Sequence, residues 1–441
     1  MKRILKRIGV AFVVLLILPI LLEVGVRIYV ESPLETDFYG SISREAVAGL
    51  QAQVGVKTVS GPGWVHLGWI ANPEKETYRI EIKNTQGWKE IGQTKFGSFL
   101  HRGLGGTYRV WSVPKDKTSP VLLGEVTVRP TFEPSPIYVP QISGEWQKLF
   151  HPKQYGSYVN DHTIYQDKKG NWRLIGITSL TNGDFNEEKY FAVGMSKDFP
   201  PPEGMSEQAP IADFGELAWA PHVIQSEGQY YIFWSPHKLH QMTSRDGINW
   251  ENHQITLSTP YHKFFRDGMV LQVAPGQWLL YTTARGFYFS QIDVYQSFDL
   301  TYWQYIRTAL RSGWGSERNS PFASMESPFV VRYQNHYYLS LTYNNDSFFL
   351  HGILLMFKIW LNRPSYNDTL VFHADNPYDF GIYRGRTRSP TLLTQLEAHA
   401  PEWVYNPSTG RWYLTTCGWP WVATLTFGEV AVAPLEWVKK P

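Results

Sequence analysis

The sequence predicts an all-β protein in three parts: an N-terminal membrane anchor, a small two-sheet β-sandwich and a five-bladed β-propeller. Three observations predict these parts: an uncharged apolar run near the N-terminus, a set of short alternating runs up to residue 129, and a five-fold repeat thereafter. Short strands separated by regular turn signals are typical of sandwiches and propellers. The chain of 441 residues is long enough for two or three domains.

The composition is that of a globular protein, with 43% hydrophobic and 18% charged residues. A net charge of +2 gives no indication of a nucleic-acid partner. The 18 Trp residues suit a sugar-binding cleft or, equally, an all-β core. The single cysteine, Cys417, excludes an intramolecular disulfide and a cysteine-based metal site.

Residues 1–30 have the pattern of a signal-anchor segment. Four basic residues precede an uncharged apolar run over residues 8–22, and no small-residue cleavage site follows it. Glu23 and Arg27 interrupt a further apolar stretch that ends at Val30. An uncleaved anchor is the prediction and a cleaved signal peptide is the alternative. Both make the protein membrane-anchored or secreted, with the bulk of the chain outside the cytoplasm.

A connector over residues 31–55 leads to a predicted sandwich over residues 56–129. Runs such as "YRIEIKN" and "TYRVWSV" alternate apolar and polar residues, as half-buried strands do. With Trp69 in an early strand and the Tyr108-x-Val110 pattern, the segment resembles a fibronectin type III or immunoglobulin-like module. Such a module implies a spacer or a glycan contact. Residues 130–146 are rich in proline, which predicts a stiff extended linker.

Residues 147–441 contain a repeat that predicts the propeller. In five stretches, among them "NDHTIYQDKKGNWRLIGITS" and "WAPHVIQSEGQYYIFWSP", small or polar residues precede an apolar pair, a turn and an aromatic-led strand. Subtraction of Ile164, Ile224, Val270, Val331 and Val404 gives spacings of 60, 46, 61 and 73 residues. Four-stranded blades have roughly this length. Five units therefore predict five blades, with a long stacked sheet as the alternative.

The residues that open each repeat are predicted to meet in one funnel, because the first strand of a blade lines the central channel. They are Asn160-Asp161-His162, Trp219-Ala220-Pro221-His222, Arg266-Asp267-Gly268, Glu326-Ser327-Pro328 and His399-Ala400-Pro401-Glu402. Carboxylates gathered in a partly dry site repel one another and raise one pKa, so that an acid and a base stand side by side. Glycosidic cleavage requires such a pair. For each acid alone, Asp161 included, a bond to a backbone amide at a strand start is the alternative.

With Asp161, Asp267 and Glu326 in order on a five-fold repeat, this region resembles the five-bladed propeller glycosidases of glycoside hydrolase family 43 and its relatives in families 32 and 68. Their pattern is an Asp in blade one, an Asp in blade three and a Glu in blade four. The sequence departs from invertases after Asp161, where His162 stands in place of Pro, and from their Arg-Asp-Pro motif at Gly268. Glu326-Ser327-Pro328 is closer to the Glu-Gly-Pro of family 43.

The resemblance implies roles for these residues. Glu326 would be the general acid, Asp161 the general base of an inverting enzyme or the nucleophile of a retaining one, and Asp267 would hold the sugar and tune the pKa of Glu326. Asn160, Trp219, His222 and Arg266 would contact substrate, and Arg266 could also pair with a neighbouring acid. His399 resembles a blade-five histidine that helps to hold Ca²⁺ in the channel through water, with a structural role as the alternative; no cofactor is required.

The function predicted in this way is that of an extracytoplasmic glycoside hydrolase acting on a pentose- or fructose-containing oligo- or polysaccharide. Two alternatives stay open: a glycan-binding propeller without catalysis, and a related transferase or phosphorylase. A phosphorylase needs a phosphate site, for which the basic run "YRGRTRS" at residues 383–389 is the one candidate. The sugar, exo or endo action and the stereochemical outcome stay open.

Overall fold

The computed structural model describes most of the chain after residue 43. The described residues are 44–72, 75–129, 135–153, 158–179, 185–211, 214–236, 238–253, 255–257, 265–284, 291–312, 324–344, 367–384, 389–418, 426 and 428–440. The predicted anchor, residues 1–30, lies outside them. Among the described residues, no helix has the length and apolar character needed to cross a membrane.

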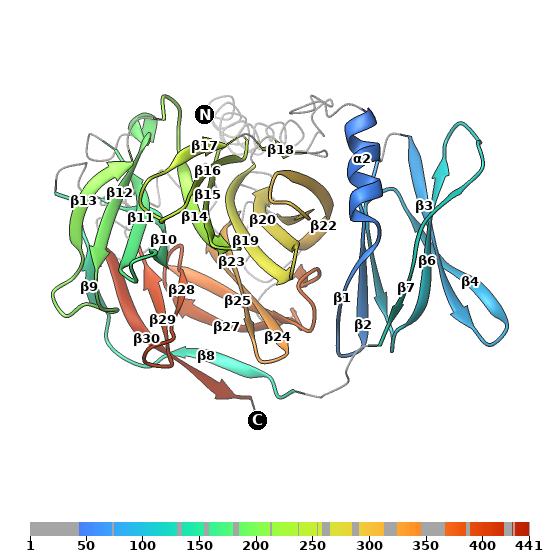
Figure 1. Cartoon of the computed structure of the whole chain (residues 1–441). Helices are drawn as coiled ribbons and strands as arrows, with labels where there is room; N and C mark the ends of the chain where they lie inside the picture. The colour runs from blue at the N-terminus through green and yellow to red at the C-terminus, as the bar shows by residue number, and fades with distance from the viewer. Residues whose placement is uncertain are drawn as a thin grey trace, which may run out of the picture.

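The N-terminal region is a seven-stranded sandwich beside the propeller (Figure 1). One sheet has the order β1–β2–β5 and the other β4–β3–β6–β7. The strands are β1 (Lys57–Gly61), β2 (Trp64–Gly68), β3 (Glu76–Asn84), β4 (Gly87–Thr94), β5 (Ser98–Arg102), β6 (Gly106–Pro114) and β7 (Val121–Val128). Alternate residues of both sheets, such as Leu67, Ile80 and Val110, are fully buried in one shared core. The period-two apolar pattern therefore folds as the sequence predicts.

A helix, α2 (Arg44–Val54), occupies the end of the segment predicted as a connector. Gln51 Nε2 donates to the backbone oxygen of Ile70, 3.1 Å away. The same amide nitrogen lies 3.3 Å from Glu76 Oε2. These bonds hold the helix against the sandwich.

The rest of the chain forms five sheets arranged around a ring (Figure 1). The first strands of blades one, two, three and four contact one another in that order, so these strands lie innermost. Blade one contains β10 (Asn160–Gln166), β11 (Trp172–Thr178), β12 (Tyr190–Ser196) and β13 (Ser206–Ile211); the short 3₁₀ helix η1 (Phe185–Glu187) precedes β12. Blade two contains β14 (Trp219–Ser226), β15 (Gln229–Ser235), β16 (His240–Ser244) and β17 (Glu251–His253).

Two additional short strands pair with the outer strand of blade three, and one of them comes from the chain segment between two strands of blade four. Blade three contains β19 (Arg266–Ala274), β20 (Gln277–Ala284), β21 (Gln291–Ser297) and β22 (Tyr302–Ser312), and β18 (Thr256–Leu257) and β26 (Gly381–Tyr383) pair with β22 in parallel. Blade four contains β23 (Ser324–Tyr333), β24 (His336–Asn344), β25 (Asp368–Ala374) and β27 (Leu392–Glu397). The predicted five-fold propeller is confirmed by this strand pairing, and the stacked-sheet alternative is wrong.

Blade five closes the ring with strands from both ends of the domain. It contains β28 (Trp403–Asn406), β29 (Arg411–Thr416), β30 (Val430–Lys439) and β8 (Tyr138–Ile142). A further strand, β9 (Gln147–Phe150), pairs with the first half of β30. The predicted linker over residues 130–146 is therefore wrong at its end: β8 completes the blade because β30 is long enough to pair with both strands and would otherwise leave an unpaired edge.

The sandwich packs directly on blades three and four. Val59 and Trp64 belong to the same buried apolar cluster as blade-three and blade-four residues such as Leu339. The His66 ring stacks on Tyr378 with 3.8 Å between the ring centroids. Gln296 of blade three donates to the backbone oxygens of Trp69 and Gly97 at 3.1 and 2.6 Å. The junction combines apolar burial with satisfied hydrogen bonds, so the two regions are held together by specific contacts.

Candidate active site

A residue with left-handed backbone lies near the start of the first strand in blades one to four and three residues before the first strand of blade five. These residues are Asp161 (φ 35°), Ala220 (φ 49°), Asp267 (φ 56°), Ser327 (φ 50°) and Ala400 (φ 42°). In blades one to four the pairing register with the second strand shifts at this place, which marks a β-bulge. A positive φ on a residue with a Cβ is strained, and bulges are frequent beside active sites, where they redirect side chains.

The bulge allows two neighbouring side chains to reach one cluster. In an ordinary strand consecutive side chains point to opposite faces. Arg266 and its neighbour Asp267 nevertheless bond each other, with 2.8 Å between Nη1 and Oδ2. Asn160 likewise donates from Nδ2 to Oδ2 of Asp161 over 3.1 Å. The left-handed openings of the blades thus concentrate polar groups at the inner rim of the ring.

Arg266 joins two of the three predicted acids. Its Nη2 donates to Oε2 of Glu326 at 2.6 Å, while Nη1 bonds Asp267. Thr283 Oγ1 of β20 donates to the same Asp267 oxygen at 3.0 Å. The predicted pairing of Arg266 with a neighbouring acid is confirmed, and it fixes the carboxyl groups of blades three and four relative to each other.

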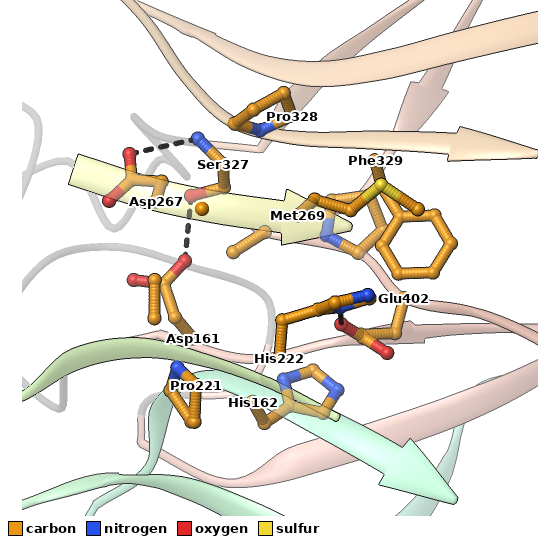
Figure 2. Close-up of a pocket in the computed structure, with 14 residues that line it drawn as sticks. Asp161, His162, Pro221, His222, Asp267, Met269, Ser327, Pro328, Phe329 and Glu402 are labelled. Atoms are coloured by element: carbon orange, nitrogen blue, oxygen red, sulfur yellow. Dashed lines mark hydrogen bonds and ion pairs between the residues drawn. The ribbon is translucent and has the colours of Figure 1, made fainter. Parts of the chain in front are cut away.

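Ser327 connects the third acid to this pair (Figure 2). Its Oγ donates to Asp161 Oδ1 at 2.6 Å, and its backbone N donates to Asp267 Oδ2 at 3.1 Å. Asp161, Asp267 and Glu326 therefore belong to one hydrogen-bonded cluster that spans three blades. The roles of Ser327 and Thr283 are not predicted from the sequence. The alignment of Ser327 with Asp161 and Asp267 at the bulge position is the signal that could have found Ser327.

Burial changes the acidity of the cluster. The pKa of Asp161 is raised well above the ordinary value, chiefly by burial and then by the charge of Asp267, against the opposing hydrogen bond from Ser327. Burial also raises the pKa of Glu326, although Arg266 opposes the shift. Glu326 Oε2 accepts from Arg266, whereas its buried Oε1 has no hydrogen-bond partner among the described residues. Because a bare buried carboxylate oxygen is costly, Oε1 is the place where a proton is best held.

Blade five supports this cluster through His399. His399 is 1% exposed, and its Nε2 donates to Asn160 Oδ1 at 3.1 Å. Burial, followed by the charge of Arg266, lowers the pKa of His399 to about 3. Calcium prefers six to eight oxygen ligands. The Nε2–H of His399 is used by Asn160, so direct coordination of Ca²⁺ by this nitrogen does not fit, and the predicted contact through water stays a prediction.

A pocket opens beside the cluster, lined by residues from all five blades. Asp161, Asp267 and Ser327 line it, together with His162, His222 and Glu402 (Figure 2). His222 Nε2 donates to the backbone oxygen of Val270 at 3.1 Å, and its Nδ1 lies 3.7 Å from Glu402 Oε1. His222 thus lies at the pocket wall with both ring nitrogens next to protein groups, and its contact with substrate stays a prediction.

His162 and Trp219 have contacts that differ from those of His222. His162, which departs from the family pattern, bonds Thr415 Oγ1 through Nε2 at 2.7 Å, and its buried Nδ1 has no partner among the described residues. Trp219 packs with the apolar cluster between blades one and two and is not among the residues that line the pocket.

Asn160 and Arg266 are likewise not among the lining residues, so His222 is the one predicted substrate contact at the pocket wall among the described residues. Glu326 does not line the pocket either; Arg266 joins it to Asp267, which does.

Comparisons with known proteins give matches among solved structures only. No protein-family model and no curated protein matches the sequence. A thermostable family-43 glycoside hydrolase is similar over 64% of this chain and 94% of its own, with 15% identity and a TM-score of 0.44. An exo-1,5-α-L-arabinanase from a bovine ruminal metagenomic library is similar over 66% of this chain and 100% of its own, with 13% identity and a TM-score of 0.42.

A third similar structure is a mutant of a family-32 β-fructofuranosidase of Bombyx mori in complex with sucrose. The similarity covers 66% of this chain and 62% of that one, with 11% identity and a TM-score of 0.44. At these identities and TM-scores the similarity adds nothing to the strand pairing that defines the propeller.

Proposed function

We propose that this protein is a glycoside hydrolase that cleaves a pentose- or fructose-containing glycan with the acids of the inner rim. The observation that supports this most is the single cluster in which Arg266 bridges Asp267 and Glu326 while Ser327 ties Asp161 to Asp267. Hydrolysis of a glycosidic bond requires a proton donor and a second carboxylate on opposite sides of the scissile bond. A protein that only binds glycan has no need of three acids joined in one hydrogen-bonded cluster.

Glu326 would act as the general acid. Its raised pKa keeps a proton at pH values where a free glutamate is ionised, and its Oε1 is the oxygen without a partner among the described residues. Proton donation to the leaving oxygen would leave a carboxylate, which Arg266 stabilises from 2.6 Å. The same residue pair thus suits both protonation states of the cycle.

Asp161 would be the general base or the nucleophile, and Asp267 would hold the sugar. Both oxygens of Asp161 accept hydrogen bonds, from Ser327 Oγ and Asn160 Nδ2, and these bonds fix the orientation of its carboxylate. Its raised pKa makes it a stronger base once it is ionised. His162 and His222 line the same pocket and would contact hydroxyl groups of the substrate.

The enzyme would lie outside the cytoplasm, attached to the membrane. A signal anchor over residues 1–30 would tether the enzyme with its bulk outside the cytoplasm, on the basis of the basic flank and the apolar run. The three-plus-four strand order of residues 57–128 supports a fibronectin type III-like module between anchor and propeller. That module would act as a spacer or as a second contact for the glycan.

A substrate screen with site variants tests the proposal. The full-length protein is assayed against aryl arabinofuranosides, xylosides, galactosides and fructans, beside Glu326→Gln and Asp161→Asn. Cleavage of one class by the wild type, lost in both variants, is the expected result. Full activity in either variant would contradict the assignment, and tight glycan binding without cleavage would favour the binding protein instead.

A further inference from the structure

A second cluster of chemically competent side chains lies away from the inner rim, on the outer part of blade four. It consists of His336 at the start of β24, His373 near the end of β25 and Asp375 just after β25. In the register of these strands Tyr337 pairs with Ala374 and Tyr338 with His373. Side chains alternate along strands, so His336, His373 and Asp375 share the face opposite to Tyr337 and Ala374. Rigid paired strands therefore present all three groups together.

The distances within this cluster suit a small cation. His336 Nδ1 lies 3.0 Å from Asp375 Oδ1 and 3.0 Å from His373 Nε2, and His373 Nε2 lies 3.9 Å from Asp375 Oδ1. Ligand atoms about 2.0–2.1 Å from a tetrahedral Zn²⁺ stand about 3.3 Å from one another. Among the described residues, this is the one group of three His, Cys, Asp or Glu side chains with ligand atoms so close together.

The hydrogen bonds of His336 leave a place for positive charge in the cluster. His336 Nε2 lies 2.9 Å from the backbone oxygen of Ser135, and a carbonyl can only accept, so Nε2 carries the hydrogen. In the neutral ring Nδ1 then presents a lone pair toward Asp375 Oδ1, which repels it unless a proton or a metal ion lies between them. A metal-bound histidine usually donates its other N–H to a carbonyl in this way.

The hydrogen bond with Asp375 raises the pKa of His336, so a proton on Nδ1 and a metal ion compete for the same place. Burial, with a further contribution from His336, lowers the pKa of His373 to about 4, so its imidazole is neutral. Asp375 has a pKa below the ordinary value, because of the hydrogen bond with His336. The His336 side chain is 10% exposed and that of His373 16%, whereas that of Asp375 is 56% exposed, so water can reach a fourth position.

The surroundings of the cluster indicate what a bound ion would do. The backbone oxygen of Asp375 accepts a hydrogen bond of 2.8 Å from Trp64 Nε1 of the sandwich. The oxygen that His336 binds belongs to Ser135, in the segment that enters β8. Three separate parts of the chain therefore meet at this place: the sandwich, the segment before β8 and blade four.

We propose that His336, His373 and Asp375 form a zinc-class metal site that fastens the sandwich and the segment before β8 to blade four. Two imidazoles and one carboxylate select Zn²⁺, Co²⁺ or Ni²⁺ over Ca²⁺ and Mg²⁺. Arg102 and Lys440 are the cationic groups that act on Asp375 and His373, and their charge opposes a bare cation. Binding therefore depends on the direct ligand bonds and fails when one ligand is removed.

Metal binding by the full-length protein, without a histidine tag and after treatment with a chelator, tests the site. Equilibrium dialysis against Zn²⁺ followed by elemental analysis should give one zinc per chain in the wild type and none in His373→Ala and Asp375→Asn. His240→Ala is the matched control: His240 also lies beside a carboxylate, 3.7 Å from Glu216, without a third ligand among the described residues. This control should keep the one zinc. Equal binding by wild type and ligand variants, or no binding by the wild type, would overturn the site.

Two readouts test the fastening and do not depend on activity. Co²⁺ should give the visible absorption of a four-coordinate ion in the wild type only, which checks the geometry even if a variant folds poorly. Zn²⁺ should raise the Tm of the wild type by a few degrees and slow its proteolysis between the sandwich and β8, with neither effect in His373→Ala. Zinc that binds without changing Tm or proteolysis would overturn the fastening role.

Discussion

Blades two and five have the same backbone at the inner rim as blades one, three and four, but not the same chemistry. The left-handed residue is Ala220 in blade two and Ala400 in blade five, and each is followed by proline. In the other three blades this residue is Asp161, Asp267 or Ser327, and all three belong to one hydrogen-bonded cluster. The left-handed opening is thus a property of the fold, and the acids are an addition to it.

This comparison shows why strain alone does not identify a site. A left-handed residue with a Cβ costs on the order of 1–2 kcal/mol, and the ring accepts that cost in all five blades. Among the described residues, it is in blades one, three and four that the side chain of the left-handed residue itself takes part in hydrogen bonds between blades. The combination of strain and a cross-blade polar network, rather than either feature alone, distinguishes the candidate catalytic blades.

The largest effect on kcat/KM is expected from a Glu→Gln substitution in blade four, and the same substitution in blade five should have a much smaller effect. Glu326→Gln should lower kcat/KM toward a substrate with a poor leaving group by about 10²–10⁴-fold, because the proton donor is lost. Glu402→Gln changes a buried acid of blade five that faces His222, outside the Arg266 cluster, and should lower kcat/KM by about tenfold or less. Steady-state kinetics on both variants checks the contrast. Equal losses would show that the acids of the two blades are not functionally distinct.

Asp161→Asn should also lower kcat/KM by about 10²–10⁴-fold, and it should stabilise the protein. Burial and Asp267 raise the pKa of Asp161, so this group favours the fold below its unfolded pKa and opposes it as the pH rises through the folded pKa. Asparagine tolerates left-handed backbone, so the bulge survives.

Thermal unfolding of wild type and Asp161→Asn between about pH 4 and pH 8 measures this effect. The Tm of the variant should exceed that of the wild type by a few degrees at the upper end, with a difference that shrinks toward the lower end. A difference that grows toward low pH would mean that the pKa of Asp161 is lowered in the folded protein.

Ser327→Ala should have a smaller effect, on pH dependence more than on folding. Alanine already occupies the corresponding position in blades two and five, so the backbone accepts it. Loss of the hydroxyl removes a hydrogen bond that lowers the pKa of Asp161, so the acidic limb of the kcat/KM profile should move to higher pH. A pH–rate profile checks this, with about a tenfold loss of activity at its acidic end. An unchanged acidic limb would exclude Asp161 as the group that titrates there.

The smallest effect is expected at the non-catalytic bulge of blade two. Ala220→Val places a β-branched side chain on left-handed backbone and should destabilise the protein by roughly 1–3 kcal/mol. Denaturant unfolding measures this change. Ile224→Val, on the same strand in ordinary extended backbone, is the matched control, with an expected cost of about 0.5–1.5 kcal/mol. Equal destabilisation by the two variants would argue against strain at the bulge.

The sequence predicts the repeat and the three acids because both depend on local patterns. Turn glycines and alternating apolar residues recur along the blades, and Asp161, Asp267 and Glu326 stand at the opening of their units. Ring closure is not local: β8 pairs with β30 across the whole length of the propeller domain, and nothing in the proline-rich run indicates that pairing. The cluster of His336, His373 and Asp375 is not predicted from the sequence for the same reason, since His336 and His373 meet only through strand register.

The dependence of rate on the leaving group tests the central claim most directly. A series of aryl glycosides of the preferred sugar, differing in the acidity of the phenol, is hydrolysed by wild type and Glu326→Gln. If Glu326 donates the proton, the variant should lose about 10²–10⁴-fold with the least acidic phenol and little with the most acidic one. A loss of the same size across the whole series would contradict a proton-donor role for Glu326.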